Sequence, residues 1–165
     1  MLKMFKPKQL LFIAVTCISL GHLVHSSKQV IHDMSKNFGK ALDLCKAELG
    51  LTDAIDDDFT NFWLDDYSVT SRDTGCAFMC LSKKLEIVDP DLKLHHGNTN
   101  EWVTKHGADE ELAKDLVNII HECEPDEADS CIKVLKWANC FKADIHKKGM
   151  APPVEVSIAE ILAEV

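Results

Sequence analysis

Apolar residues recur every three or four positions along most of the chain, which is the spacing of one face of an α-helix. The first such stripe runs from Val30 to Leu49 and stops at Gly50, and a second, shorter stripe runs from Ile55 to Trp63. The second stripe begins among acidic residues that suit a helix N-terminus, namely Asp53, Asp56, Asp57 and Asp58. We therefore predict one helix over each stripe and a break over residues 65–70.

A third helix is predicted from Ser71 to about Leu85. It should end before Pro90, because proline disfavours a helical residue ahead of it. The following residues, 91–97, have no periodicity and are predicted to form a loop. Asn98, with Glu101 three positions later, has the pattern of a capping box, which predicts a short helix to about residue 106.

Two longer helices are predicted after this one. The first opens at Asp109 and ends at Pro125, with a broad apolar face between these residues. The second is capped by Asp129 or Ser130 and ends before Gly149. Because no stretch alternates apolar and polar residues as a strand does, the sequence predicts an all-α fold in a single domain.

Residues 1–26 have the pattern of a secretory signal peptide. Three lysines precede an apolar run from Leu10 to Leu20, and small residues follow before a predicted cut ahead of Ser27. The run is too short to span a bilayer. We therefore expect a secreted mature chain of about 139 residues, 27–165.

Six cysteines remain once Cys17 leaves with the leader: Cys45, Cys76, Cys80, Cys123, Cys131 and Cys140. An even set in an oxidising compartment predicts a disulfide framework, although six cysteines allow fifteen pairings. Cys76 and Cys80 lie four apart on one helix face, so each is better placed to reach another segment than to bond its neighbour. A zinc site or a thiol enzyme would need these cysteines reduced.

Charge and motifs exclude several classes of protein. Without the three leader lysines, the whole-chain charge of −9 becomes −12, which makes nucleic acid and anionic membranes poor partners. The sequence has no nucleophile elbow, no His-Glu-x-x-His and no glycine-rich phosphate loop, so we predict no enzyme, no cofactor and no metal. A rigid inhibitor or interaction module stays open as an alternative to a carrier with an apolar cavity.

The cysteine spacing resembles the six-cysteine signature of insect odorant-binding proteins. Successive cysteines are separated by 30, 3, 42, 7 and 8 residues, of which the second and last intervals are the most specific and the fourth is short for the family. Several runs narrow the resemblance to moth pheromone-binding proteins: Ser35 to Ala41, Asn61 to Trp63, Asp89 to Asp91, Leu94 to Asn98, Lys105 to Glu110 and Ala163 to Val165.

The resemblance implies about six helices around an apolar chamber that holds a long-chain alcohol, aldehyde or acetate. It implies the disulfides Cys45–Cys80, Cys76–Cys131 and Cys123–Cys140. Ser35 and Ser82 would be the polar contacts to the ligand. The apolar walls would include Ile31, Phe38, Phe62, Trp63, Phe78, Ile87, Val88, Leu94, Trp102, Val117, Ile120, Ala138 and Phe141.

The last residues, 153–165, form an amphipathic tail after Pro152 and Pro153. Its apolar face is interrupted by Glu155, Glu160 and Glu164. The alternative interpretation of this segment is a surface helix or a frayed terminus. In the family that the chain resembles, this tail enters the chamber in acid and displaces the ligand. The resemblance also implies a pH gate at His95, His96 and His121, which the sequence alone would interpret as solvated side chains first and a metal site last.

The function implied by the resemblance is transport in olfaction. The secreted protein would carry a hydrophobic odorant through antennal sensillum lymph to an olfactory receptor, or to the membrane of the sensory neuron, and would release it at acidic pH. The sequence decides neither the exact ligand and head group nor whether the chain forms a homodimer.

Overall fold

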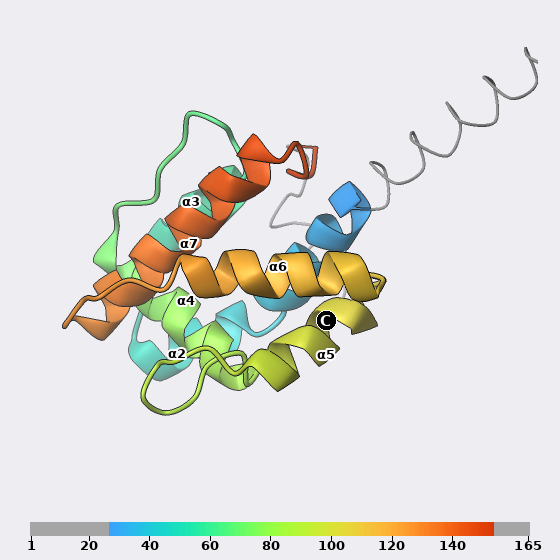
Figure 1. Ribbon diagram of the computed structural model, residues 1–165. Helices are drawn as coiled ribbons and strands as arrows, with labels where there is room; N and C mark the ends of the chain where they lie inside the picture. The colour runs from blue at the N-terminus through green and yellow to red at the C-terminus, as the bar shows by residue number, and fades with distance from the viewer. Residues whose placement is uncertain (1–26, 154–165) are drawn as a thin grey trace, which may run out of the picture.

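A computed structural model describes residues 27–153; the predicted leader and residues 154–165 of the predicted tail lie outside the described residues. Residues 27–39 are helical, and the helices that follow are α2 (Leu42–Leu49), η1 (Asp53–Ile55), α3 (Asp56–Asn61), α4 (Arg72–Lys84), α5 (His96–Lys105), α6 (Glu110–Glu122) and α7 (Ser130–Lys147), drawn in Figure 1. The described residues contain no β-strand beyond one isolated bridge between Val88 and Leu94. The all-α prediction is therefore confirmed. Within the same range, no helix is both long and apolar enough to cross a membrane.

Most predicted helix boundaries agree with the structure, and the side chains at the helix starts explain why. Ser71, Asp109 and Asp129 each accept hydrogen bonds from backbone N–H groups in the first turn of α4, α6 and α7. These N–H groups have no partner within the helix, so a side-chain oxygen at this position stabilises the helix start by about 1 kcal/mol. The choice between Asp129 and Ser130 as the cap of the last helix is thereby decided for Asp129.

Two helix predictions were wrong. The stripe from Val30 to Leu49 is broken at residues 40–41, where the N–H of Lys40 donates to the carbonyl of Asn37, and the chain turns so that Leu42 and Cys45 are buried. The predicted capping box at Asn98 does not cap α5 either.

Helix α5 begins two residues before Asn98. The ring nitrogen Nδ1 of His95 accepts the Asn98 N–H at 3.1 Å and so fills the capping role. The side chain of Asn98 instead donates to the carbonyl of Glu86 at 3.2 Å. An imidazole nitrogen thus replaces the capping oxygen that the sequence pattern had predicted.

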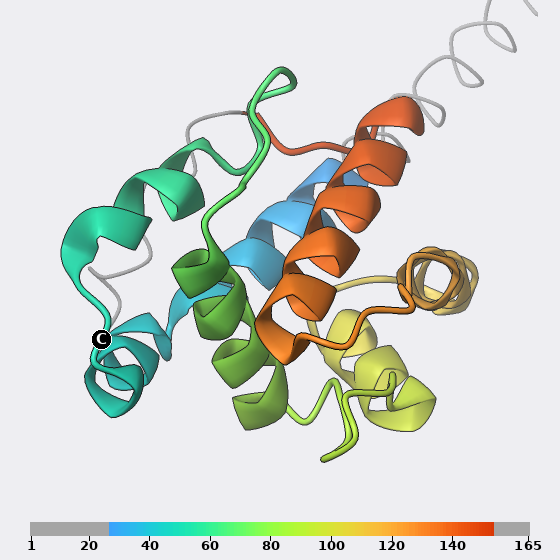
Figure 2. The same ribbon diagram turned by 90° about the vertical axis from the view of Figure 1, so that its left-hand side faces the viewer.

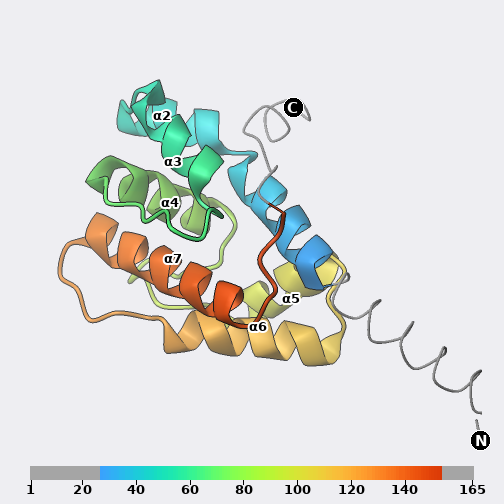
Figure 3. The same ribbon diagram turned by 90° about the horizontal axis from the view of Figure 1, so that it is seen from above.

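Helices α4 and α7 lie side by side at the centre of the molecule. Figures 2 and 3 show α2 and α3 on the α4 side of this pair, and α6 on the α7 side. Helix α5 packs on α6. The buried residues of these helices form two adjoining apolar clusters, to which residues 27–39 contribute Val30, Ile31 and Met34.

Three disulfides join these layers with the pairing that the resemblance implied. Cys45–Cys80 joins α2 to α4, Cys76–Cys131 joins α4 to α7, and Cys123–Cys140 joins the end of α6 to α7. The cysteines of α4 therefore bond to two different helices, as their spacing indicated. Each bond closes a loop of 17 to 55 residues, and loops of this length lose enough unfolded-state entropy to stabilise a fold by about 3–4 kcal/mol.

Candidate functional site

A cavity of about 160 Å³ lies among the helices. A volume of about 10–15 Å³ by the same measure already holds one water, so this space is far larger than a packing defect. Its walls come from residues 27–39, α3, α4, α5, α6, α7 and the segment after α4. The lining residues are Ile31, Met34, Ser35, Phe38, Phe59, Phe62, Trp63, Phe78, Ser82, Ile87, Val88, Trp102, Ile120, Val134, Trp137, Ala138 and Phe141.

Two residues expected on the wall do not line the cavity. Leu94 is buried beside Val88, to which it is bridged, and Val117 is buried in the core one turn before Ile120. Both contribute to packing behind the wall. The remaining residues of the predicted wall all face the cavity.

Four lining residues were missed by the sequence reasoning: Met34, Phe59, Val134 and Trp137. Each lies three or four positions from a residue that was predicted, on the same helix or at its end. Because residues with this spacing share a helix face, the signal was present in the sequence. Met34, for example, lies one turn from both Ile31 and Phe38.

Aromatic rings make much of the wall rigid. The ring of Phe78 on α4 lies 4.9 Å from that of Phe59, 5.5 Å from Phe62 and 6.0 Å from Phe38, measured between centroids. The tilted and edge-on angles of these pairs are the arrangements that aromatic rings prefer. The cluster joins residues 27–39, α3 and α4 around one side of the cavity.

The indole N–H groups on the wall are already bonded to protein atoms. Trp63 Nε1 donates to Ser35 Oγ at 2.9 Å, Trp102 Nε1 donates to Asn37 Oδ1 at 2.7 Å, and Trp137 Nε1 donates to the carbonyl of Ile120. These three side chains therefore present apolar ring surface to the cavity. Their polar atoms are not available to another molecule without loss of a protein contact.

The two serines on the wall differ in whether the hydroxyl proton is already bonded to a protein atom. Ser35 Oγ donates to the carbonyl of Ile31 at 2.7 Å and accepts from Trp63, so its proton is engaged. The Ser82 side chain is buried, with 7% exposed, and its hydroxyl forms no hydrogen bond with any other described residue. Among the described residues, the enclosed side-chain polar atom that lacks a partner is His146 Nε2, so the Ser82 oxygen is not sealed by protein atoms and can be reached from the cavity. Ser82 is therefore the wall residue whose proton is free for a guest molecule.

The segment between α4 and α5 closes one side of the cavity through Ile87 and Val88. The N–H of His95 donates to the carbonyl of Ile87 at 2.8 Å, and the buried Thr99 hydroxyl also reaches this carbonyl. Two residues of the segment, Glu86 and Leu92, have positive φ values of 54° and 58°. Such values are disfavoured for residues with a side chain, so neighbouring contacts must hold this backbone in place.

Two histidines of the expected gate, His95 and His96, lie at the end of this segment, the third, His121, lies on α6, and all three are exposed. His96, in the first turn of α5, and His121, in the last turn of α6, have ring centroids 4.9 Å apart. His95 caps α5 and does not share this ring contact. The structure therefore brings two of the three together, whereas Glu155, Glu160 and Glu164 lie outside the described residues.

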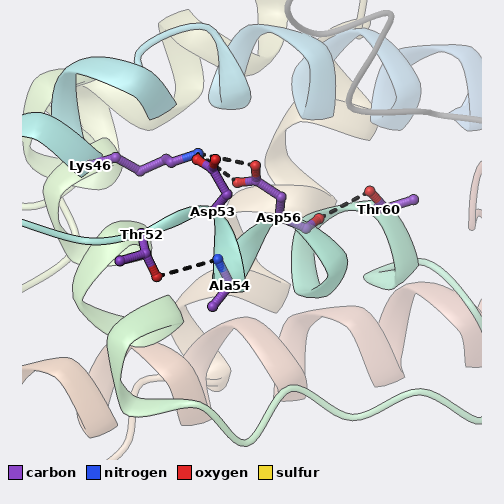
Figure 4. Close-up of polar contacts among 6 residues, drawn as sticks. All are labelled: Lys46, Thr52, Asp53, Ala54, Asp56 and Thr60. Carbon is purple, nitrogen blue, oxygen red and sulfur yellow. Dashed lines mark hydrogen bonds and ion pairs between the residues drawn. The ribbon is translucent and has the colours of Figure 1, made fainter.

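A half-buried lysine, Lys46, fixes the position of α3, which carries Phe59 to the wall. Lys46 Nζ lies 2.6 Å from Asp53 Oδ1 and 2.9 Å from Asp56 Oδ1, and Figure 4 shows the ammonium between the two carboxylates. Burial by itself would lower the pKa of Lys46. Hydrogen bonds and attraction to both aspartates outweigh this effect, so the pKa of Lys46 is raised. Helix α2 is thereby tied to η1 and α3.

Small helical chains that are joined by several disulfides and keep an apolar cavity form a class of binding proteins. The chain matches the PBP/GOBP family over residues 27–144 and belongs to it. Pheromone-binding protein 2 of Epiphyas postvittana is 54% identical over 98% of this chain and all of its own length. General odorant-binding protein 2 of Bombyx mori is 38% identical over 98% of this chain and 99% of its own.

A solved structure agrees with this assignment. The crystal structure of Epiphyas postvittana pheromone-binding protein 3 is 49% identical, has a TM-score of 0.61 and covers 66% of this chain and 95% of its own. The relatives are named as binding proteins, so the expectation that this chain is not an enzyme is confirmed.

Proposed function

We propose that the protein is a secreted carrier that holds one long-chain hydrophobic pheromone or odorant in the cavity. The observation that carries the proposal is an apolar wall with the free hydroxyl of Ser82 in it. An aliphatic chain gains about 0.8 kcal/mol for each buried methylene, so a chain of a dozen carbons gains several kcal/mol after ordering costs. One oxygen atom at the end of this chain would satisfy Ser82, which fits an alcohol, an aldehyde or an acetate.

The relatives support the biological setting. Their printed names include pheromone-binding and general odorant-binding proteins, and the N-terminal residues of this chain have the pattern of a secretory leader. The protein would then take up its ligand in antennal sensillum lymph and deliver it to an olfactory receptor.

Acid would release the ligand through the tail. Burying Glu155, Glu160 and Glu164 in the cavity disfavours their charged forms, so a state with the tail inserted binds more protons than a state with the tail outside. The inserted state therefore gains population as the pH falls. The rings of His96 and His121 lie 4.9 Å apart, and two neighbouring cations repel each other, so positive charge on both rings would loosen the junction of α5 and α6.

Competitive displacement of an apolar fluorescent reporter tests the carrier function. Long-chain alcohols should displace the reporter from the wild-type protein, and Ala138→Phe, which fills the cavity, should abolish its binding. Ala143→Phe is a matched control, because Ala143 lies exposed on the same helix. Equal binding by the two variants would exclude the cavity as the binding site, and turnover of a long-chain ester would favour an enzyme instead.

Truncation after Pro153 tests the acid release separately. The truncated protein should bind at neutral pH like the full chain and should keep its ligand at about pH 5, where the full chain loses it. Release by both proteins in acid would show that the tail is not the displacing element. That result would leave the carrier function itself intact.

A further inference from the structure

Lys142 on α7 is a buried cation that has no carboxylate partner among the described residues 27–153. Only 5% of the residue is exposed, and its ammonium donates to two backbone carbonyls, those of Leu64 and Tyr67. Burial lowers its pKa, and the nearby charges of Asp65 and Asp66 oppose this shift without cancelling it. Because burying an ammonium is unfavourable unless its donors are satisfied, these carbonyls must be held close to α7.

Two further side chains on the same face of α7 bind the stretch of chain that contains Leu64 and Tyr67. The side-chain amide of Asn139 accepts from the Val69 N–H at 3.2 Å and donates to the Val69 carbonyl at 2.8 Å. His146 Nδ1 lies 3.3 Å from Asp65 Oδ1, while its buried Nε2 has no hydrogen-bond partner within the described residues. Asn139, Lys142 and His146 are three and four positions apart, so they form one line along the helix.

The segment held by these three side chains, residues 64–69, is the first part of the connection from α3 to α4. This connection runs along α7 in Figures 1 and 3. It has no regular secondary structure, so contacts from outside must satisfy its backbone. The side chains of α7 supply them. Tyr67 adds a second attachment, because its hydroxyl donates to Asp58 Oδ1 on α3 at 2.5 Å.

The segment is directly continuous with the cavity wall. Phe62 and Trp63 precede it without a break, both line the cavity, and their rings lie 5.0 Å apart. The Lys142 ammonium lies over the Phe62 ring, 5.9 Å from its centroid. Trp63 in turn contacts Phe141 and His146 of α7, at 6.3 Å and 6.2 Å between centroids. A shift of residues 64–69 would therefore move this aromatic pair.

We propose that Lys142 is a positioning residue that sets which ligand lengths the cavity accepts, because it holds residues 64–69 on α7 and thereby fixes Phe62 and Trp63. This inference rests on the proposed carrier function. With Lys142 in place, the aromatic pair is a fixed wall and a longer chain meets resistance. Without it, the wall yields and the cavity discriminates less between chains of different length.

The test compares Lys142→Met with the wild-type chain. Methionine is unbranched and apolar but has no donor, so the carbonyls of Leu64 and Tyr67 lose the ammonium. Displacement of an apolar fluorescent reporter by a series of straight-chain alcohols gives the affinity for each length. A buried methylene is worth about fourfold in affinity, so the preference for the best alcohol over one two carbons longer should fall by up to about 15-fold.

Lys136→Met is the matched control, because Lys136 is an exposed residue of the same helix that pairs with Glu127. It should keep the wild-type length profile, and Lys142→Arg, which retains the charge and the donors, should restore much of it. Should Lys142→Met not fold, Asn139→Ala releases the same segment at Val69 and should broaden the profile in the same direction. A folded Lys142→Met or Asn139→Ala variant with an unchanged profile overturns the inference. Failure of the wild-type protein to bind any alcohol would instead overturn the carrier function.

Discussion

The indole N–H of Trp63 donates to the hydroxyl oxygen of Ser35, 28 residues earlier in the chain, at 2.9 Å. The Ser35 hydroxyl in turn donates a hydrogen bond to the carbonyl of Ile31 at 2.7 Å. This pair joins residues 27–39 to the end of α3 across the cavity wall. The two wall serines therefore have different roles. Ser35 is hydrogen-bonded to other wall residues, whereas the Ser82 hydroxyl has no hydrogen bond to a described residue.

Ser82→Ala should weaken the binding of long-chain alcohols and leave the binding of alkanes of the same length unchanged. The lost hydrogen bond is worth about 0.5–1.5 kcal/mol, or roughly two- to tenfold in Kd. Ser35→Ala should act mainly on stability, because it leaves the Trp63 N–H without its acceptor at a cost of about 1–3 kcal/mol. Reporter displacement and chemical denaturation measure the two effects. An equal loss of alcohol and alkane affinity in Ser82→Ala would contradict the assigned role.

Gly75→Ala should destabilise the protein by about 1–3 kcal/mol, because the backbone of α4 lies against the backbone of α7 at this position, with no room for a side chain. A Cβ added to Gly75 would lie 2.3 Å from the carbonyl oxygen of Cys131, next to the disulfide from Cys76. An atom placed there forces the helices apart. Gly97→Ala in α5 is the control, because its Cβ would meet only the His95 ring, at 3.6 Å or more, and alanine favours a helix. Thermal unfolding measures both variants, and Gly75→Ala should melt at the lower temperature. Equal melting temperatures would show that α4 and α7 have room for a side chain at Gly75.

Tyr67 is the only tyrosine in the chain, so tyrosinate absorbance reports on it alone. The hydrogen bond to Asp58, burial and the negative charges of Asp58 and Asp57 raise the pKa of Tyr67 to about 12. We expect half-ionisation near pH 12 in the folded protein and near pH 10 in denaturant. Asp58→Asn should lower the folded value. A folded value near 10 would show that the hydroxyl is not bonded to Asp58.

The same shift predicts how stability depends on pH. Between about pH 10 and pH 12 the folded protein keeps the Tyr67 proton that the unfolded chain has lost, so this contribution to stability is full below pH 10 and disappears as the pH rises through 12. Tyr67→Phe has no such proton and should lose less stability over this range. Chemical denaturation at several pH values measures the difference.

The order and type of the helices could be predicted from the chain because the relevant interactions are local. Apolar spacing and caps such as Asp109 act within one or two helical turns, and a residue pattern records them directly. The local pattern gave a wrong prediction where contacts between residues far apart in the chain determine the structure. The stripe from Val30 to Leu49 continues through residues 40–41, but burying Leu42 and joining Cys45 to Cys80 requires a turn there.

The cavity wall was only partly predictable for the same reason. Helix spacing shows which residues share a face, but it does not show which part of that face meets the cavity and which part meets another helix, as Val117 and Ile120 illustrate. The different states of Ser35 and Ser82, and the burial of Lys142 against Leu64 and Tyr67, depend on groups far apart in the chain. Hydrogen bonds of this kind exist only once folding has brought both partners together, so packing in three dimensions decided them.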